Sequence, residues 1–299
     1  MFNMFVPAIR GVLVVCLFCV NTVLCALPLF LVVAIKFFLP AARVRAACST
    51  ILDAIVAGWI SINGVIINCC IPTTIRATGV DSFEDCQSSL VTSNHQCWAD
   101  ILMVQKMLNR RLPVLKFFIK KELIWVPVLG QCWWALGYPF MKRYSRAYLE
   151  KHPEKRGEDL TTARKACEKL ESGAVCFFNF IEGTRFSAEK HAEQKSPFKY
   201  LLKPRAGGSA LVIGALNGRL NHVVDLTICY HGGAPDFWGF VCGRCPAITV
   251  HLDKIAIPQH FQGRNYQIDQ QYRRDIQEWI NTIWQEKERK LASMVQAGS

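Results

Sequence analysis

The longest uncharged segment of the chain lies near its N-terminus and restricts the folds that the chain can adopt. Residues 11–35 read GVLVVCLFCVNTVLCALPLFLVVAI and include no charged side chain. A helix needs about 20 mostly apolar residues to cross a bilayer, and proline, found here at position 28, is tolerated in membrane helices. The alternative is a secretory signal peptide, whose apolar core has only about 7–15 residues. The length of the segment therefore predicts a retained membrane helix.

A second uncharged segment, residues 54–75, is less apolar than the first and is bounded by charged residues. It predicts a second membrane helix or a helix lying partly in the interface, with a buried helix of a soluble domain as the alternative. The basic residues between the two segments are Lys36, Arg43 and Arg45, whereas Arg10 alone precedes the first. The positive-inside rule then places the C-terminal end of the first helix in the cytoplasm. A shallow second helix keeps the rest of the chain on that side.

The formal net charge of +12 indicates an anionic partner, such as a nucleic acid, a phospholipid surface or a phosphorylated substrate. The sequence has no recognised nucleic-acid-binding motif but does have a membrane segment, so we predict no nucleic-acid partner. The 14 cysteines are scattered through apolar segments, as expected for buried thiols in a reducing compartment. Cys242 and Cys245 form one CxxC motif without a second Cys/His pair, which predicts a turn with buried thiols and no zinc site.

From residue 76 onward, short apolar runs alternate with longer polar segments, a pattern typical of an α/β domain. Strands are predicted at residues 88–93, 112–118, 174–181, 223–231 and 246–252, and helices at 98–110 and 158–172. The near-continuous apolar run AVCFFNFI, residues 174–181, suits a strand that is covered on both faces. The fold prediction is an α/β domain with a largely parallel mixed sheet flanked by helices.

The domain boundaries follow from these patterns. Residues 1–75 are predicted to form the membrane anchor, residues 76–260 the catalytic domain, and residues 261–299 a C-terminal amphipathic helix. The apolar stripe of that helix consists of Tyr272, Ile276, Trp279, Ile280 and Ile283. The stripe predicts a helix docked on the domain, and contact with a membrane surface or a partner is the alternative.

Reactive groups in α/β sheets gather at the carboxyl ends of strands, and the loop SNHQCWAD follows one predicted strand. His95 should lie at the entrance to the next helix, and Asp100 about one turn into it. A carboxylate on Nδ1 would fix the imidazole tautomer and leave Nε2 free as a general base. The alternative is a loop histidine near an aspartate that caps the helix.

The loop IEGTRFS follows the most apolar strand. Arg185 can bind a phosphate bidentately, and Gly183 allows the backbone to approach a ligand closely. Glu182 could orient Arg185 or accept a hydrogen bond from a substrate hydroxyl, and the alternative is a polar turn with a local ion pair. The sequence has no G-x-S-x-G elbow, no cysteine in the setting of an activated nucleophile and no P-loop. It therefore predicts a histidine base acting on a substrate hydroxyl without a covalent intermediate.

These two loops are similar to motifs of a known enzyme superfamily. NHQCWAD resembles the N-H-x4-D block of the glycerolipid acyltransferases, the superfamily of lysophosphatidic acid acyltransferases, and FIEGTRFS resembles its F-P-E-G-T-R-S block. KKELIWVPVLG and SPFKYLLKPRAGG resemble two further blocks, and all four occur in the family's order over about residues 75 to 230. The full pattern most closely resembles the bacterial YihG-type branch, which is related to lysocardiolipin acyltransferases.

The resemblance implies a reaction and a catalytic pair. His95 would deprotonate the free hydroxyl of a lysophospholipid such as 1-acylglycerol-3-phosphate, and Asp100 would hold His95. The alkoxide would attack the thioester of acyl-CoA or acyl-ACP, in phospholipid synthesis or remodelling. The donor is a co-substrate, and neither a cofactor nor a metal is implied.

The resemblance also implies a substrate site. Glu182 and Arg185 would place the phosphate of the acceptor, with Lys121 as a second cation, while Gly183 and Thr184 would shape the loop. The chain departs from the family pattern in three places: Ile181 replaces the usual proline, Phe186 separates Arg185 from Ser187, and Cys97 stands where serine is frequent. These departures leave the acceptor open between lysophosphatidic acid, lysophosphatidylglycerol and lysocardiolipin, and a non-catalytic phospholipid-binding relative is the further alternative.

The expected location is the bacterial inner membrane, with the catalytic domain facing the cytoplasm and anionic membrane phospholipids as partners. The segment LPVLKFFIKKELIW mixes lysines with large apolar residues, which suits a surface that dips into lipid headgroups.

Overall fold

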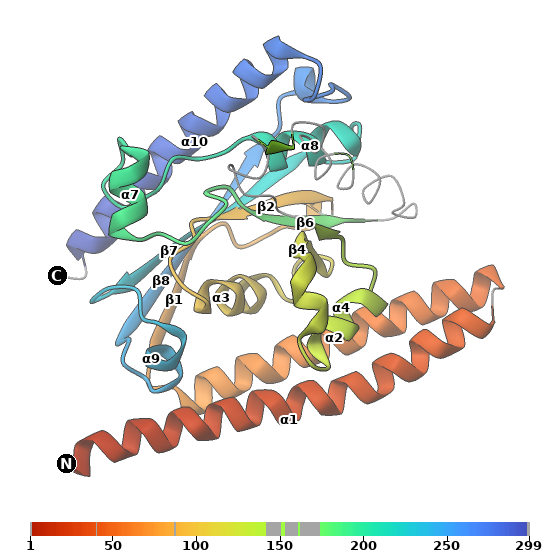
Figure 1. Ribbon diagram of the computed structural model, residues 1–299, viewed down its shortest axis with the longest axis vertical. Helices are drawn as coiled ribbons and strands as arrows, with labels where there is room; N and C mark the ends of the chain where they lie inside the picture. Colours follow the sequence, from red (N-terminus) through yellow and green to blue (C-terminus); the bar gives the residue numbers. More distant parts are fainter. Residues whose placement is uncertain are drawn as a thin grey trace.

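A computed structural model of the chain describes residues 2–39, 41–86, 88–141, 151–152, 161 and 174–297. Apart from position 161, the helix predicted at residues 158–172 lies outside the described residues. The described part forms a central sheet with helices on both faces and a long helical hairpin along one side (Figure 1).

The main sheet has the strand order β1-β8-β7-β2-β6-β3, and every neighbouring pair is parallel except β7 and β8. The strands are β1 (Thr74–Gly79), β2 (Ser89–Ser93), β3 (Leu115–Phe117), β6 (Cys176–Phe180), β7 (His222–His231) and β8 (Ala247–Ala256). A separate pair joins β4 (Ile119–Lys120) to β5 (Phe140–Met141). The prediction of a largely parallel mixed sheet flanked by helices is confirmed.

Strand β1 was not predicted, and the boundary placed between residues 75 and 76 falls inside it. Its sequence, TIRATG, has no apolar run, because β1 is an edge strand with mostly exposed side chains. Its parallel pairing with β8 makes it part of the sheet rather than of the N-terminal helices.

Two apolar clusters cover the two faces of the sheet, and adjacent residues of β2 contribute to different clusters. Val91 packs with α3 (Ala99–Leu108) and α9 (Phe237–Val241), whereas Leu90 packs with α8 (Gly207–Ala215) and α10 (Gln270–Ala297). This alternation is the two-residue period of a strand buried on both faces. Figure 1 shows α3 below the sheet and α8 and α10 above it. The remaining helical elements are η1 (Glu84–Cys86), η2 (Lys121–Trp125), α4 (Leu129–Ala135), α7 (Ala188–Gln194) and η4 (Gln259–Phe261).

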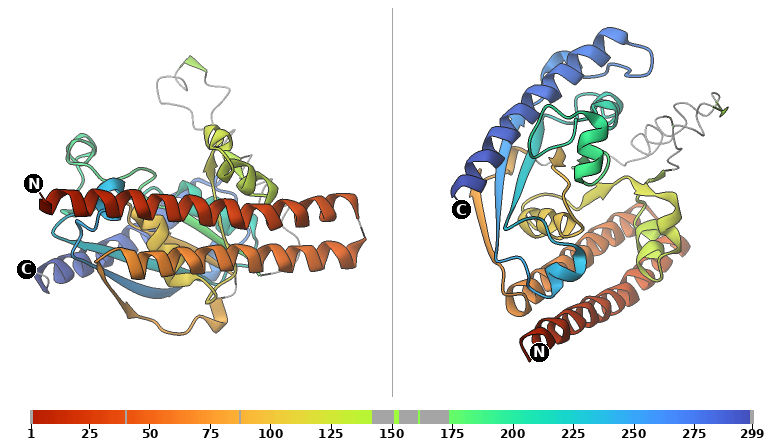
Figure 2. Two further views of the ribbon diagram at one scale, coloured as in Figure 1. Left: turned by 90° about the horizontal axis from the view of Figure 1, so that it is seen from below. Right: turned by 60° about the vertical axis from the view of Figure 1, so that its left-hand side comes forward.

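Helices α1 (Phe2–Phe38) and α2 (Ala42–Cys70) form an antiparallel hairpin that lies lengthwise beneath α3 (Figures 1 and 2). Helix α1 contacts α4 and α9, and α2 contacts α3. The buried Asn21 amide joins the two helices, donating to Asn63 Oδ1 at 2.8 Å and to the Trp59 carbonyl at 3.0 Å. By length and composition, both helices are long and apolar enough to cross a membrane.

The second helix differs from its prediction at both ends. It starts 12 residues before the uncharged segment 54–75 and ends at Cys70. Arg43, Arg45 and Asp53 are therefore helical residues. The charged residue Asp53, which bounded the predicted segment, does not mark the start of the helix. Beyond Cys70 the backbone is extended, and Pro72, which cannot donate a backbone hydrogen bond, lies just past the helix end.

Helix α10 docks on the domain, as its apolar stripe predicted. Tyr272, Ile276, Ile280 and Trp284 are buried against the sheet and α8, on the face opposite the hairpin. Lys287 of the same helix is also fully buried. Its ammonium donates to the Leu226 carbonyl at 2.6 Å and pairs with Asp225 of β7 at 2.9 Å. Burial lowers the pKa of Lys287, and Asp225 opposes that shift.

We expect Lys287→Ala to lower the free energy of unfolding by about 3–5 kcal/mol, because it leaves the Asp225 carboxylate buried without its cation. The matched control is Arg289→Ala, which removes an exposed Arg289–Glu286 pair two residues away and should have little effect. Denaturant unfolding of the purified proteins measures both. An equal, small effect of the two variants would contradict a structural role for the buried pair.

Candidate active site

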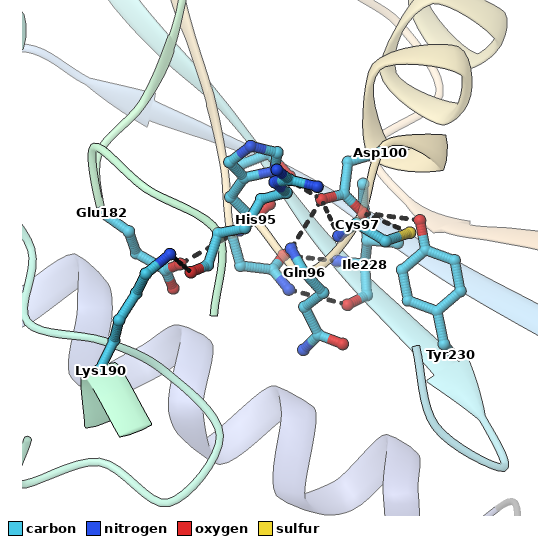
Figure 3. A network of polar contacts seen from close by, with 11 residues as sticks. His95, Gln96, Cys97, Asp100, Glu182, Lys190, Ile228 and Tyr230 are labelled. Atoms are coloured by element: carbon cyan, nitrogen blue, oxygen red, sulfur yellow. Dashed lines mark hydrogen bonds and ion pairs between the residues drawn. The ribbon is translucent and has the colours of Figure 1, made fainter. Parts of the chain in front are cut away.

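His95 and Asp100 flank the start of α3, at the carboxyl end of the central strand β2. His95 Nδ1 lies 2.8 Å from Asp100 Oδ2, so the predicted pair is in direct contact (Figure 3). Because the carboxylate accepts the hydrogen bond, the Nδ1 atom carries the proton and Nε2 keeps its lone pair. The irregular backbone at residues 94–97 brings Asp100 back to the ring, where an ideal helix would hold the two side chains about 140° apart.

Asp100 is fully buried and receives four hydrogen bonds besides that from His95, one of them a long bond from the Cys97 thiol at 3.8 Å. The backbone N–H groups of Gln96 and Cys97 donate to Oδ2 at 2.7 and 2.9 Å, and the Tyr230 hydroxyl donates to Oδ1 at 2.6 Å. An ionised carboxylate satisfies all of these donors with its two oxygens. Asp100 is thereby fixed from the loop on one side and from β7 on the other.

The His95 ring and its backbone are also held in place. The imidazole stacks on Phe180, with ring centroids 3.7 Å apart and planes 11° apart, and the side chain keeps 14% of its surface exposed. The preceding residue, Asn94, is buried and pairs with both backbone groups of Ile228, at 2.8 and 2.9 Å. A rigid histidine with one accessible nitrogen is the geometry that a general base requires.

The second loop adjoins His95 because β6, which precedes it, pairs with β2 in parallel register. The Phe186 N–H donates to the His95 carbonyl at 2.7 Å, and the His95 N–H lies 3.4 Å from Glu182 Oε2. The two predicted loops are thus in direct contact, through the backbone N–H and the carbonyl of His95.

Glu182 lies behind this loop and is 1% exposed. Within the described part of the chain its Oε1 atom has no hydrogen-bond partner. Burial raises the pKa of Glu182 to about 8, against the lowering effect of the hydrogen bond from the His95 N–H. The carboxyl group supports the His95 backbone and does not face the open side of the loop.

The cations of the site come from the second loop and the helix after it. The Arg185 guanidinium lies 5.0 Å from the centre of the Trp98 ring, in a cation–π contact. Lys190 of α7 donates to the Thr184 hydroxyl at 2.8 Å and to the Arg185 carbonyl at 3.1 Å. Gly183, with a φ of +71°, makes the turn.

Lys121 is exposed at the start of η2. Among the described residues, no hydrogen bond or ion pair joins its side chain to the His95 or Arg185 loops, although the parallel pairing of β3 with β6 leads it to the same edge of the sheet. Two residues of the site were missed from the sequence. Tyr230 is 130 positions from Asp100 and ends an apolar strand, and Lys190 is one of many surface lysines. Only the sheet order and the loop geometry identify them.

An apolar cavity of about 420 Å³ lies between the helical hairpin and helices α3 and α4. Its walls include Phe18 of α1, Trp59 of α2, Trp133 of α4 and Trp98 of the catalytic loop. Trp98 therefore borders the cavity and also carries the Arg185 guanidinium. A long apolar group could lie in this cavity, next to Trp98 of the loop that carries His95.

The CxxC motif lies elsewhere, in the turn after α9, where Cys242 and Cys245 are both buried. Among the described residues, no group of three or more His, Cys, Asp and Glu side chains is arranged to hold a metal ion.

The sequence matches the model of a known protein family. This family model, described as Acyltransferase, matches residues 74–230, which run from β1 through the His95 and Arg185 loops to Tyr230. The chain belongs to the acyltransferase family. The predicted membership of the glycerolipid acyltransferase superfamily is confirmed.

Several named acyltransferases are similar to this chain in sequence, and one is similar in structure. The human 1-acyl-sn-glycerol-3-phosphate acyltransferase gamma is 26% identical over 215 residues, covering 68% of this chain and 52% of the relative. The mouse lysocardiolipin acyltransferase 1 is 25% identical over 264 residues, covering 82% and 64%. The chain thus spans about half the length of the gamma relatives. The crystal structure of the 1-acyl-sn-glycerophosphate (LPA) acyltransferase PlsC from Thermotoga maritima aligns with a TM-score of 0.48 and 13% identity, covering 89% of this chain and 97% of that chain.

The burial of Glu182 predicts a pH-dependent stability of the acyltransferase. Its pKa in the folded state, about 8, lies above its usual value of 4.5, so the folded protein binds the proton more tightly than the unfolded chain. The stability that the folded protein gains from this tighter proton binding is fully present below the usual pKa of 4.5. It is lost as the pH rises through the folded-state pKa of about 8. The free energy of unfolding should fall by up to about 1.4 kcal/mol per pH unit in this window.

Glu182→Gln, which keeps a neutral amide at this position, should remove that part of the pH dependence. Thermal unfolding between pH 5 and pH 8.5 measures it, with the exposed Glu193→Gln as the control. Parallel curves for the wild type and Glu182→Gln would show that Glu182 does not titrate in this range.

Proposed function

We propose that this chain is a membrane-bound acyltransferase that moves a fatty acyl chain from acyl-CoA or acyl-ACP to the free hydroxyl of a lysophospholipid such as 1-acylglycerol-3-phosphate. The observation that carries the proposal is the buried, multiply hydrogen-bonded Asp100 carboxylate, which holds His95 through Nδ1 and leaves Nε2 without a bond to Asp100. The names of the similar proteins support an acceptor of this class.

In the proposed reaction, His95 Nε2 takes the proton of the acceptor hydroxyl while Asp100 stabilises the imidazolium that forms. The hydroxyl oxygen attacks the thioester carbonyl carbon, a C–O bond forms and the C–S bond breaks. The leaving thiolate takes the proton back from His95. The products are the acylated phospholipid and the free thiol of CoA or of the carrier protein.

The chemistry of Cys97 supports direct transfer without an acyl-enzyme. Cys97 is the cysteine of the catalytic loop, and its Sγ lies 3.8 Å from Asp100 Oδ1. Burial, together with the charge of Asp100, raises the pKa of the Cys97 thiol to about 12. At neutral pH the group is a thiol, and the thiolate is the nucleophilic form.

The hairpin supports membrane attachment of the proposed enzyme. Leu24, Leu27 and Leu31 of α1 are each more than 60% exposed, on a face that turns away from the domain. Both helices lie lengthwise along the domain and pack on it, so an upright hairpin would carry α3, α4 and α9 into the hydrocarbon (Figure 2). We therefore infer that the hairpin embeds along one leaflet, and we assign it to the cytoplasmic leaflet of the bacterial inner membrane.

Two exposed tryptophans extend this surface. Trp134 of α4, which packs on α1, is 65% exposed, and Trp125 of η2, which packs on α4, is 81% exposed. Tryptophan is enriched at the headgroup level of membranes. The apolar cavity lies between the hairpin and helices α3 and α4 and is bordered by Trp98, so an acyl chain in it would extend from the hairpin toward the loop that carries His95.

The second candidate function is acyl transfer to lysophosphatidylglycerol or lysocardiolipin. The similarity to lysocardiolipin acyltransferase 1 favours it, because that alignment covers more of this chain than the gamma alignments do. A non-catalytic phospholipid-binding role fits less well, because such a role does not require a held histidine with a free nitrogen.

We expect His95→Ala to lower the rate of acyl transfer at least about 10²–10⁴-fold, because it removes the general base. The assay follows release of free thiol from acyl-CoA with 1-acylglycerol-3-phosphate as the acceptor. His260→Ala, at an exposed histidine of η4, is the matched control and should keep full activity. Full activity of a folded His95→Ala variant would refute the proposed mechanism.

Membrane attachment is tested by placing charges on the exposed face of α1. The triple variant Leu24→Glu, Leu27→Glu, Leu31→Glu should lose co-sedimentation with phospholipid vesicles, since each leucine contributes about 1.5–3 kcal/mol when it enters an apolar phase. The control is Ile268→Glu, which is 77% exposed and lies near α10, away from the hairpin. Equal sedimentation of both variants would contradict attachment through α1.

A further inference from the structure

Three cations surround the turn at Gly183, and the predicted site included only one of them. Arg185 lies in the turn itself, and Lys190 reaches back from α7 to the Thr184 hydroxyl and the Arg185 carbonyl. Arg205 comes from the segment before α8, where its Cδ and Nη1 atoms lie 3.7 and 3.9 Å from the position that a Gly183 Cβ would occupy. Its backbone N–H is bonded to the Ile181 carbonyl at 2.9 Å, which fixes it beside the turn.

No ion pair among the described residues joins these three cations to a carboxylate. None of Arg185, Lys190 and Arg205 forms an ion pair with a described Asp or Glu, although ten ion pairs elsewhere in the described chain do hold their partners within 4.0 Å. Glu182 is buried behind the loop, whereas Glu189, next to Lys190 in α7, interacts with Lys190 electrostatically without forming an ion pair. Within the described part of the chain, the turn therefore has three cations and an excess of positive charge.

The cations also have unused hydrogen-bond donors. Lys190 uses two of its three N–H donors on Thr184 and Arg185, which leaves one for a ligand. The Arg185 guanidinium rests on the Trp98 ring, a contact that leaves its in-plane donors available. Arg205 is exposed. Side chains held in place in this way lose little freedom when an anion binds.

The turn adjoins the catalytic histidine. Phe186, the residue after Arg185, bonds to the His95 carbonyl at 2.7 Å. Figure 3 shows Lys190 extending toward the loop on the same side of His95 as Glu182. In 1-acylglycerol-3-phosphate the free hydroxyl and the phosphate are carried by adjacent carbons. A phosphate at the turn would therefore leave the hydroxyl near His95.

We propose that Arg185, Lys190 and Arg205 together bind the phosphate of the acceptor and select a phosphate monoester over a phosphodiester. This inference rests on the proposed function and narrows its acceptor class. It adds Lys190 and Arg205 to Arg185 as the second and third cations of the turn.

The selectivity follows from charge and from the number of free oxygens. A phosphate monoester carries about −1.5 to −2 charges at pH 7 and presents three acceptor oxygens. A phosphodiester carries one charge and has two unsubstituted oxygens. A guanidinium can bind two oxygens of one phosphate while an ammonium binds the third as a point charge. Removing one cation should thus weaken monoester binding more than diester binding.

The test measures equilibrium binding of two lysolipids to the purified full chain in detergent, without an acyl donor. The probes are short-chain 1-acylglycerol-3-phosphate and lysophosphatidylglycerol with the same acyl chain. The variants are Lys190→Met and Arg205→Gln, with Lys190→Arg as the charge-preserving variant. The matched control is Lys199→Met, an exposed lysine that lies between the two positions in sequence and contacts Tyr200. Unfolding temperatures of all variants establish that they are folded.

We expect the wild type to bind the monoester more tightly than the diester. Lys190→Met and Arg205→Gln should each weaken monoester binding about tenfold or more, as for a lost hydrogen bond to a charged group, and should reduce the preference over the diester. Lys190→Arg should restore most of the preference, and Lys199→Met should leave it unchanged. Equal binding of the two lysolipids by the wild type, or unchanged monoester binding in folded Lys190→Met and Arg205→Gln, would overturn the inference.

Acyl transfer measured on the same wild-type preparation separates this inference from the proposed function. Selective monoester binding without transfer of an acyl chain would support the three-cation site and refute the proposed reaction. Transfer with no preference between the two lysolipids, and with unchanged binding in the variants, would support the reaction and overturn the site.

Discussion

The parallel pairing of β2 with β6 on one side and with β7 on the other brings the whole site together. The register aligns Ser93 with Phe180 and with Leu226, so the chain leaves two of these strands at the same edge of the sheet. The loop after β2 carries His95, and the loop after β6 carries Arg185. The longer strand β7 continues past this edge and presents Tyr230 to Asp100. A change of register by one residue would turn each of these side chains to the opposite face.

The burial of Asp100 determines how the His95 ring is held. A carboxylate that loses its water must receive hydrogen bonds from the protein, and Asp100 receives them from the loop backbone, from Tyr230 and from His95. The same hydrogen bonds that stabilise the buried charge also orient the imidazole. Asn94 and Phe180 then fix the loop and the ring, so the histidine has little freedom to reorient. Structural stability and the placement of the base thus depend on the same contacts.

The sequence predicted those parts of the molecule that short-range patterns determine. The apolar run of β6 and the HxxxxD spacing of His95 and Asp100 are local, and both features occur in the structure as predicted. The role of Tyr230 depends on the order of strands in the sheet, and no periodicity encodes it. Helix α2 continues through charged residues because a helix can bury one face, here with Leu52 and Val56, while charged side chains such as Asp53 lie on its exposed side. The buried position of Glu182 depends on the backbone conformation of the turn at Gly183. That conformation cannot be predicted from the residue types alone.

The position of Trp98 relates the apolar and the charged halves of the site. Its ring borders the apolar cavity beneath α3 and also contacts the Arg185 guanidinium. One side chain therefore lies between the apolar cavity and the cations of the turn. An amphiphile bound here would place its acyl chain toward the hairpin and its anionic group toward the turn. The reverse orientation would bury a phosphate among apolar side chains, which costs far more than any apolar contact returns. In the proposed reaction, the polarity of the site would therefore orient the acceptor relative to His95, and a membrane-embedded hairpin would place the apolar side of that site next to the bilayer.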